Sequence, residues 1–162
     1  MDVFYYWKNY DKDFRDGHIG WLKSDRKKLG SLRERYPTFI WAFQTPPGCK
    51  GKLKLVAKLV WSDIPKVALP KLEAASTIYY DPTDPHTAFY NEMDTNETID
   101  AITTLLRSQF PSAFRANFRG DNGIQVMEGD FLRSFQKLVG GLGLRSIERQ
   151  ANLCNQRTER IL

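Results

Sequence analysis

Cysteine is scarce in this chain of 162 residues, which contains only Cys49 and Cys154. Two isolated cysteines form no CxxC pair, so the sequence excludes a cysteine-rich zinc site and a disulfide scaffold, and we expect a reducing, cytoplasmic environment. Long hydrophobic runs are also missing, because runs such as Val3 to Trp7 are far shorter than the ~20 apolar residues that span a bilayer. The N-terminus lacks the cationic segment and small-residue cleavage site of a signal peptide, and we expect no membrane partner.

The motifs of common nucleotide-binding and hydrolytic enzymes are absent as well. The chain contains no GxxxxGK[ST], GxGxxG, HExxH or GxSxG sequence, and glycine-rich residues 140–143 follow a predicted helix rather than a strand. Histidine occurs only at His18 and His86. A metal site of Asp81, Asp84 and His86 stays open as the centre of a metal-dependent nuclease or nucleotide-processing enzyme, although loop aspartates usually serve turns. Apart from that alternative, we expect no cofactor and no catalysis by this chain.

Positive charge is concentrated in the first part of the chain. The 24 Lys and Arg exceed the 19 Asp and Glu, which gives a formal net charge of +5 and a pI of about 9.2. Residues 1–70 hold 14 basic against 7 acidic residues, residues 71–110 hold 2 against 7, and residues 111–162 hold 8 against 5. This distribution favours a polyanionic partner, and nucleic acid is the first such partner to consider.

Apolar periodicity predicts strands in the first half of the chain and helices in the second. The pattern indicates an α+β fold, a curved sheet or small barrel flanked by helices, in one domain over residues 1–143. Residues 144–162 form a helical tail or a linker. The predicted strands are 3–7, 39–44, 52–61, 76–80 and 114–118, and the predicted helices are 24–35 with Ser24 as its cap, 94–110 with Asp94 as its cap, and 131–139. A polar loop is expected at 9–16. Strict alternation in 52–61 places Leu53, Leu55, Ala57, Leu59 and Trp61 on one buried face.

Aromatic residues alternate with cations in the basic part of the chain. Trp7 precedes Lys8, and Trp21 precedes Lys23 and a run of basic residues. Cations that neutralise phosphates and rings that stack on bases are the side chains that hold nucleic acid. Trp21 follows Gly20, which lets a ligand approach closely, so it is the best candidate for a pocket rim. Trp61 lies on the regular apolar face of its strand and is predicted to be core.

Several segments resemble EVE domains, which belong to the PUA superfamily and are related to YTH and ASCH domains. Trp21-Leu22-Lys23-Ser24-Asp25 is similar to the W-L-x-K-S-E-P opening of that family. A short basic helix then leads into the aromatic strand 39–43, and residues 51–61 take the place of the family's G-V-V-G-I-A-E-V strand. Tyr79-Tyr80-Asp81-Pro82 is similar to its Y-Y-D-P-K segment. The similarity covers residues 3–90, and Arg26 stands where the family has its proline.

The resemblance implies a pseudo-barrel whose pocket accepts a modified, flipped base, with methylation as the expected modification, as the specificity domain of a modification-dependent restriction or defence system. Such domains often occur beside a nuclease or an AAA+ motor, as a partner or fused domain, and we expect DNA rather than RNA as the ligand. The pocket residues expected here are Tyr5, Trp7, Trp21, Ser24, Asp25 and Trp41. The phosphate-binding residues expected are Lys23, Arg26, Lys27, Lys28, Arg33, Arg115 and Arg119.

A third hypothesis is an interaction protein. The tail carries Ile147, Ala151, Cys154 and Ile161 at helical spacing, so a partner chain would bury that apolar face.

Overall fold

One mixed sheet forms the centre of the molecule. The computed structural model describes residues 1–24, 27–69, 76–90, 95–142 and 144. The strand order is β2-β5-β4-β3-β1-β7, with β6 paired to β4 outside this order. β1 and β3 are parallel, and the other pairs are antiparallel. The strands are β1 (Asp2–Tyr6), β2 (Trp21–Lys23), β3 (Phe39–Gln44), β4 (Lys54–Ser62), β5 (Thr77–Asp81), β6 (Ala88–Phe89) and β7 (Ile124–Met127).

The two central strands carry apolar side chains on both faces. Side chains alternate between the two faces along a strand, and in the register of β1 against β3 the paired residues lie on the same face. An inner face holds Val3, Tyr5, Ile40 and Ala42. A helical face holds Phe4, Trp41 and Phe43. The sheet therefore separates two apolar clusters and must be covered on both sides.

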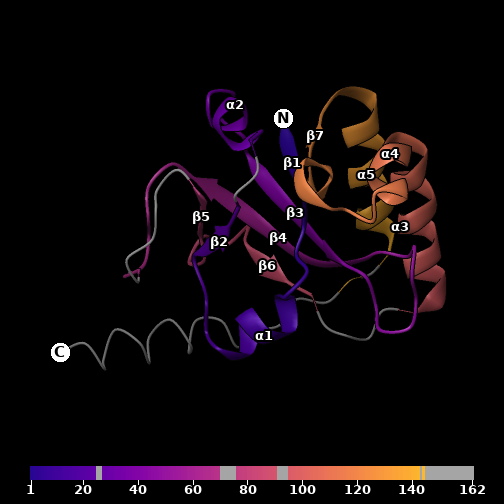
Figure 1. Cartoon of the computed structure of the whole chain (residues 1–162), viewed down its shortest axis with the longest axis horizontal. Helices are drawn as coiled ribbons and strands as arrows, with labels where there is room; N and C mark the ends of the chain where they lie inside the picture. Colours follow the sequence, from indigo (N-terminus) through magenta and orange to yellow (C-terminus); the bar gives the residue numbers. More distant parts are fainter. Residues whose placement is uncertain (25–26, 70–75, 91–94, 143, 145–162) are drawn as a thin grey trace.

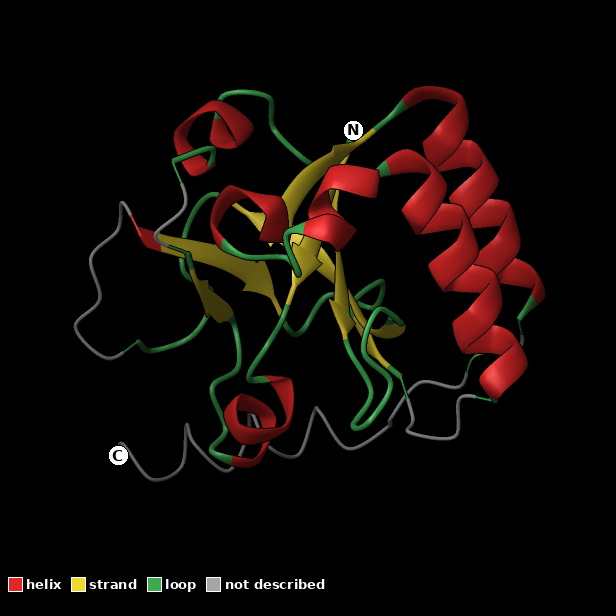
Figure 2. Ribbon diagram, turned by 45° about the vertical axis from the view of Figure 1, so that its right-hand side comes forward, coloured by secondary structure: helices red, strands yellow, loops and turns green. Residues whose placement is uncertain are grey.

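The sheet is strongly curled into a half-barrel (Figures 1 and 2). The hydroxyl of Tyr5 on β1 donates a hydrogen bond of 2.8 Å to the carbonyl oxygen of Lys23 on β2, although three strands separate β1 from β2 in the sheet order. Leu22 and Ile78 from one end of the sheet lie in the same apolar cluster as Tyr5. The inner face is thus the inside of the curl, and the α+β class predicted from the sequence is confirmed.

A bulge in β4 overturns the predicted single apolar face of that strand. Ala42 pairs with Ala57 but Phe43 pairs with Leu55, so Val56 is an extra residue between two paired positions. An extra residue reverses the face on which the following side chains lie. Leu53 and Leu55 therefore lie on the helical face, whereas Ala57, Leu59 and Trp61 lie on the inner face. Trp61 is 9% exposed and belongs to the core, as predicted.

Three helices cover the helical face, and two short helices flank the inner face at opposite ends (Figures 1 and 2). Ile102, Leu106 and Phe135 are buried against the sheet. The covering helices are α3 (Asn96–Gln109), α4 (Pro111–Arg115) and α5 (Gly129–Gly141), and the end helices are α1 (Tyr10–Arg15) and α2 (Leu29–Arg33). No helix in these described segments is long and apolar enough to cross a membrane.

Some predicted elements are wrong in kind or extent. The predicted strand 114–118 is occupied by α4 and a following turn, since Pro111 suits the first turn of a helix. The predicted polar loop 9–16 is mostly α1, and the helix predicted over 24–35 is shorter and does not begin at Ser24. Thr95 caps α3 by accepting a bond from the Thr98 amide. Asp94 and the tail from 145 to 162 lie outside the described residues.

Candidate functional site

Tyr5 and Trp7 are core side chains. Trp7 is 3% exposed and sits among the rings of Tyr5, Tyr10 and Phe89, with centroid distances between 5.1 and 6.5 Å. Its indole Nε1 donates to Oδ2 of Asp13 at 2.8 Å. The phenol of Tyr5 is engaged by the Lys23 carbonyl, as described above. Both residues thus fill the curl and anchor its ends, and neither presents an open wall.

Trp41 lies on the opposite face of the sheet from Tyr5 and Trp7, and strands β5 and β4 separate its strand from that of Trp21. It lies on the helical face, is 3% exposed, and packs edge-on against Phe135 at 5.0 Å. Its Nε1 donates to Oδ2 of the buried Asp2 at 2.8 Å, and Oδ1 of Asp2 accepts a bond from the Phe39 amide. Expecting Trp41 beside Trp21 is wrong, because β5 and β4 lie between their strands and the Trp41 ring packs on Phe135 of α5.

Trp21 differs from the other tryptophans in the hydrogen bonding of its indole nitrogen. It is 7% exposed, yet its Nε1 has no hydrogen-bond partner in the described segments, and Trp21 belongs to neither apolar cluster. On β2 it pairs with Tyr79, while its neighbour Leu22 faces the inside of the curl. A buried indole nitrogen without a hydrogen-bond partner is uncommon, because the large majority of buried side-chain polar atoms in folded proteins are hydrogen-bonded.

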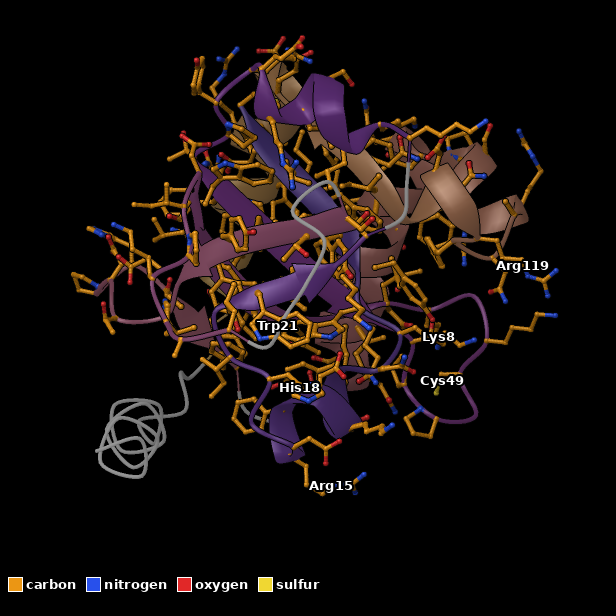
Figure 3. The ribbon with its side chains drawn as sticks, turned by 60° about the vertical axis from the view of Figure 1, so that its left-hand side comes forward. Lys8, Arg15, His18, Trp21, Cys49 and Arg119 are labelled. Carbon is orange, nitrogen blue, oxygen red and sulfur yellow. The ribbon has the colours of Figure 1, made fainter. Side chains whose placement is uncertain are left out.

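The imidazole of His18 lies on the Trp21 ring (Figure 3). The two centroids are 5.1 Å apart with 31° between the planes. His18 Nδ1 lies 3.4 Å from Oδ1 of Asp13, and their side chains are 38% and 29% exposed. Asp13 therefore connects Trp7 in the core to His18 at the rim. We define His18, Trp21 and Asp13 as the Trp21 site.

Two glycines shape the backbone around His18. Gly17 and Gly20 both have positive φ, at 70° and 95°, a region that glycine adopts without steric cost. The His18 amide donates to the Asp13 carbonyl at 2.8 Å, and the Gly20 carbonyl accepts a bond from the Tyr80 amide at 3.1 Å. A Cβ at Gly20 would lie 2.4 Å from Cγ2 of Val67. The backbone on both sides of His18 is therefore held by hydrogen bonds and packing, which places the imidazole on the Trp21 ring.

Ser24 follows the Trp21 site along the chain. It is 3% exposed, and its Oγ has no partner among the described residues, although its amide donates to the Ser76 carbonyl at 2.7 Å. Ser24 is therefore a second buried polar group close in sequence to Trp21. Asp25 and Arg26, which the sequence also assigned to the site, lie outside the described residues.

The predicted phosphate-binding cations fall into two groups. Lys23, Lys27 and Lys28 are exposed beside β2 and α2, and Lys28 Nζ donates to Gln125 Oε1 at 3.4 Å. Arg33 is half-buried and donates to the Thr77 carbonyl, so it serves the fold. The second group, Arg115 and Arg119, is exposed around α4, away from the Trp21 site (Figure 3 labels Arg119).

The acidic loop uses its carboxylates locally. Asp81 Oδ1 accepts bonds from the amide and hydroxyl of Thr83, and Asp84 Oδ1 accepts one from the His86 amide and lies 3.0 Å from His86 Nδ1. Burial acts to raise the pKa of Asp81, but the Thr83 bonds and the positive charge of Lys66 outweigh it and hold that pKa below its ordinary value. The described residues contain no group of three His, Cys, Asp or Glu placed to hold a metal ion.

Comparison with family models, with curated proteins and with solved structures gives no match to this chain. Sequence reasoning identified Trp21 but missed His18 and Asp13. Asp13 stands six residues after Trp7, in a segment predicted to be a loop, and no local pattern signals the bond between them.

Proposed function

We propose that this chain is a nucleic-acid-binding module that recognises a modified base by stacking it on Trp21. One observation carries the proposal: the Trp21 indole N–H is buried without a partner beneath a half-exposed imidazole. The base takes the place of His18 on the face of the indole, and an acceptor of the bound strand that lies in the plane of the indole ring receives the Nε1–H bond. The expected ligand is DNA, and a nuclease or AAA+ motor would supply catalysis in a restriction or defence system.

The free energy that a base gains at Trp21 is comparable to the cost of extruding that base from a duplex. Leaving a buried donor unpaired costs about 1–3 kcal/mol, which a ligand acceptor recovers. Stacking one base on an aromatic ring is worth about 1–3 kcal/mol. Extruding a base from a duplex costs a few kcal/mol, and less when the base is already single-stranded. The two gains together are comparable to this cost, so the phosphate contacts must supply the remaining affinity.

Two further features support an EVE-like module. The strongly curled mixed sheet is compatible with a PUA-like pseudo-barrel. Lys23 lies two residues after Trp21 on the same face of β2, and Lys27 and Lys28 follow as exposed cations. Alternation along a strand places residues i and i+2 together, so Lys23 is positioned to meet the phosphate of a base stacked on Trp21.

Binding of labelled 15-mer strands and duplexes tests this function. The panel pairs DNA and RNA carrying methylated or hydroxymethylated cytosine, or methylated adenine, with unmodified controls. We expect one modification to bind more tightly than its control, and Trp21→Phe to reduce that ratio about tenfold because it keeps a ring but removes the donor. Trp61→Phe is the matched control, since the Trp61 Nε1 already donates a hydrogen bond to Asp63 Oδ1.

Two outcomes would contradict the proposal. Equal binding of all modified and unmodified strands would leave a polyanion surface without base recognition. An unchanged ratio in Trp21→Phe would remove the indole donor from recognition. Far-UV circular dichroism of each variant checks that the fold is retained.

A further inference from the structure

Three segments distant in the sequence meet around Tyr6, at the end of β1. The Tyr6 ring stacks on Phe118 with centroids 4.6 Å apart, and its hydroxyl donates to Thr45 Oγ1 at 3.1 Å. The amide of Trp7, the next residue, donates to the Phe43 carbonyl at 2.8 Å. The end of β1, the loop after β3 and the turn after α4 are therefore held together by contacts through Tyr6 and its neighbour.

Each of these segments carries an exposed cation within a few residues of these contacts. Lys8 follows Tyr6 by two residues, Lys50 lies in the loop that Thr45 opens, and Arg119 follows Phe118. None of the three forms an ion pair within the described segments. Figure 3 shows Lys8, Cys49 and Arg119 on the same side of the molecule. We call Tyr6, Lys8, Lys50 and Arg119 the Tyr6 surface.

Neighbouring charged groups are largely committed to other contacts. Lys52 pairs with Asp100 at 2.8 Å, and Arg107 donates to the Gly51 carbonyl. Asp11, the acidic residue that follows Lys8 most closely, accepts a bond from Gln44 Nε2 at 2.8 Å. The neutral Gln44 amide leaves the Asp11 charge in place, but the carboxylate is oriented toward β3. The three cations of the Tyr6 surface form no ion pair with Asp11 or with Asp121, the acidic residue two positions after Arg119.

The turn that presents Arg119 is built at a conformational cost. Asn117 and Phe118 have φ of 52° and 59°, a left-handed conformation that is unusual for a bulky side chain. Such residues cost about 1–3 kcal/mol each and persist where packing over-determines them. Phe118 is 3% exposed and contacts the rings of Phe4, Tyr6 and Phe114. These contacts fix the turn, so the backbone that leads into Arg119 is held where Phe118 packs on Tyr6.

We propose that the Tyr6 surface binds the phosphodiester backbone of a nucleic-acid strand, as a second contact distinct from the Trp21 site. The inference rests on the proposed nucleic-acid function and names where the strand is held. Three cations without ion pairs among the described residues, carried by three segments that meet at Tyr6, suit a chain of evenly spaced phosphates. The Tyr6 surface supplies affinity without base discrimination, whereas the Trp21 site supplies discrimination.

Salt dependence measures this contact directly. Each phosphate neutralised on a single strand adds about 0.7 to the slope of log affinity against log salt concentration. Removing three cations is therefore expected to lower the slope by about 2. The experiment measures fluorescence anisotropy of an unmodified 15-nucleotide oligothymidylate from 50 to 300 mM NaCl, with the full chain and the variant Lys8→Ala/Lys50→Ala/Arg119→Ala.

The matched control is Lys66→Ala/Arg133→Ala/Lys137→Ala, which removes the same charge from exposed positions elsewhere. A slope lowered by about 2 in the first variant and by less than 0.7 in the control supports the proposal. An equal loss in both variants overturns it, because net charge alone would explain binding. Unchanged oligonucleotide binding with lost binding to phosphatidylserine vesicles also overturns it, in favour of an acidic lipid surface.

Failure here and failure of base recognition are distinguishable. The Tyr6-surface variant is expected to keep the wild-type ratio between modified and unmodified strands, whereas Trp21→Phe is expected to keep the wild-type salt slope. As an independent readout, bound oligothymidylate should slow alkylation of the half-buried Cys49 at least threefold in a Cys154→Ala background. Equal alkylation rates with and without saturating oligonucleotide would overturn the placement of the strand.

Discussion

The same substitution at two tryptophans is expected to have very different effects on stability. Trp41 Nε1 donates to the buried carboxylate of Asp2, whereas Trp21 Nε1 has no partner among the described residues. Trp41→Phe loses a hydrogen bond to a charged group, worth about 1.5–3 kcal/mol, and about 1 kcal/mol of ring packing. Asp2 would keep only the longer bond from the Phe39 amide, at 3.3 Å. The expected loss in unfolding free energy is about 3 kcal/mol.

Trp21→Phe loses a similar amount of ring packing but also removes a buried donor that has no partner. Burial of such a donor costs about 1–3 kcal/mol, so its removal offsets the lost packing. We therefore expect the unfolding free energy of Trp21→Phe to lie within about 1 kcal/mol of the wild type. The difference between the two variants should be about 2–3 kcal/mol, a large share of a typical total of about 5–15 kcal/mol.

Urea denaturation followed by far-UV circular dichroism measures both values without depending on tryptophan fluorescence. With an m-value of about 2 kcal/mol/M, Trp41→Phe should lower the midpoint by about 1.5 M and Trp21→Phe by less than 0.5 M. Equal midpoint losses would refute the reasoning, because they would mean that the Trp21 indole is bonded in the folded protein. The site proposed on that free donor would then lose its main support.

Two further predictions concern the backbone and pH. Gly20→Ala should lower the unfolding free energy by about 1–3 kcal/mol, because φ is +95° and the new Cβ would meet Val67. Gly30→Ala, at an exposed position of α2, should raise the unfolding free energy by about 0.5–1 kcal/mol. Urea titrations of the two variants check both signs. The pKa of Asp81 lies below its ordinary value of 3.8, so its carboxylate stabilises the fold above that pH and the contribution is lost as pH falls through the folded-state pKa. The melting temperature of Asp81→Asn should accordingly fall less than that of the wild type between pH 7 and pH 3. An identical fall would contradict the role of the Thr83 bonds.

Local patterns in the sequence determined the elements in which apolar residues recur at a regular spacing. Strand β3 and helices α3 and α5 were predicted because apolar residues recur at the spacing of those structures, and each element packs through that spacing. The α+β class followed from the same patterns. The prominence of Trp21 was also visible, since a glycine precedes it and a basic run follows.

The tertiary structure alone decided which side of the sheet each aromatic ring occupies. The bulge at Val56, between the pairs Ala42–Ala57 and Phe43–Leu55, reverses the faces of β4. The bond from Trp7 to Asp13 and the stack of His18 on Trp21 depend on where α1 turns back. The segments that carry Lys8, Lys50 and Arg119 meet through contacts of Tyr6 with Thr45 and Phe118. Hydrophobic periodicity specifies how a segment buries its own face, whereas the meeting of distant segments is set by the curl of the sheet and the packing of its ends.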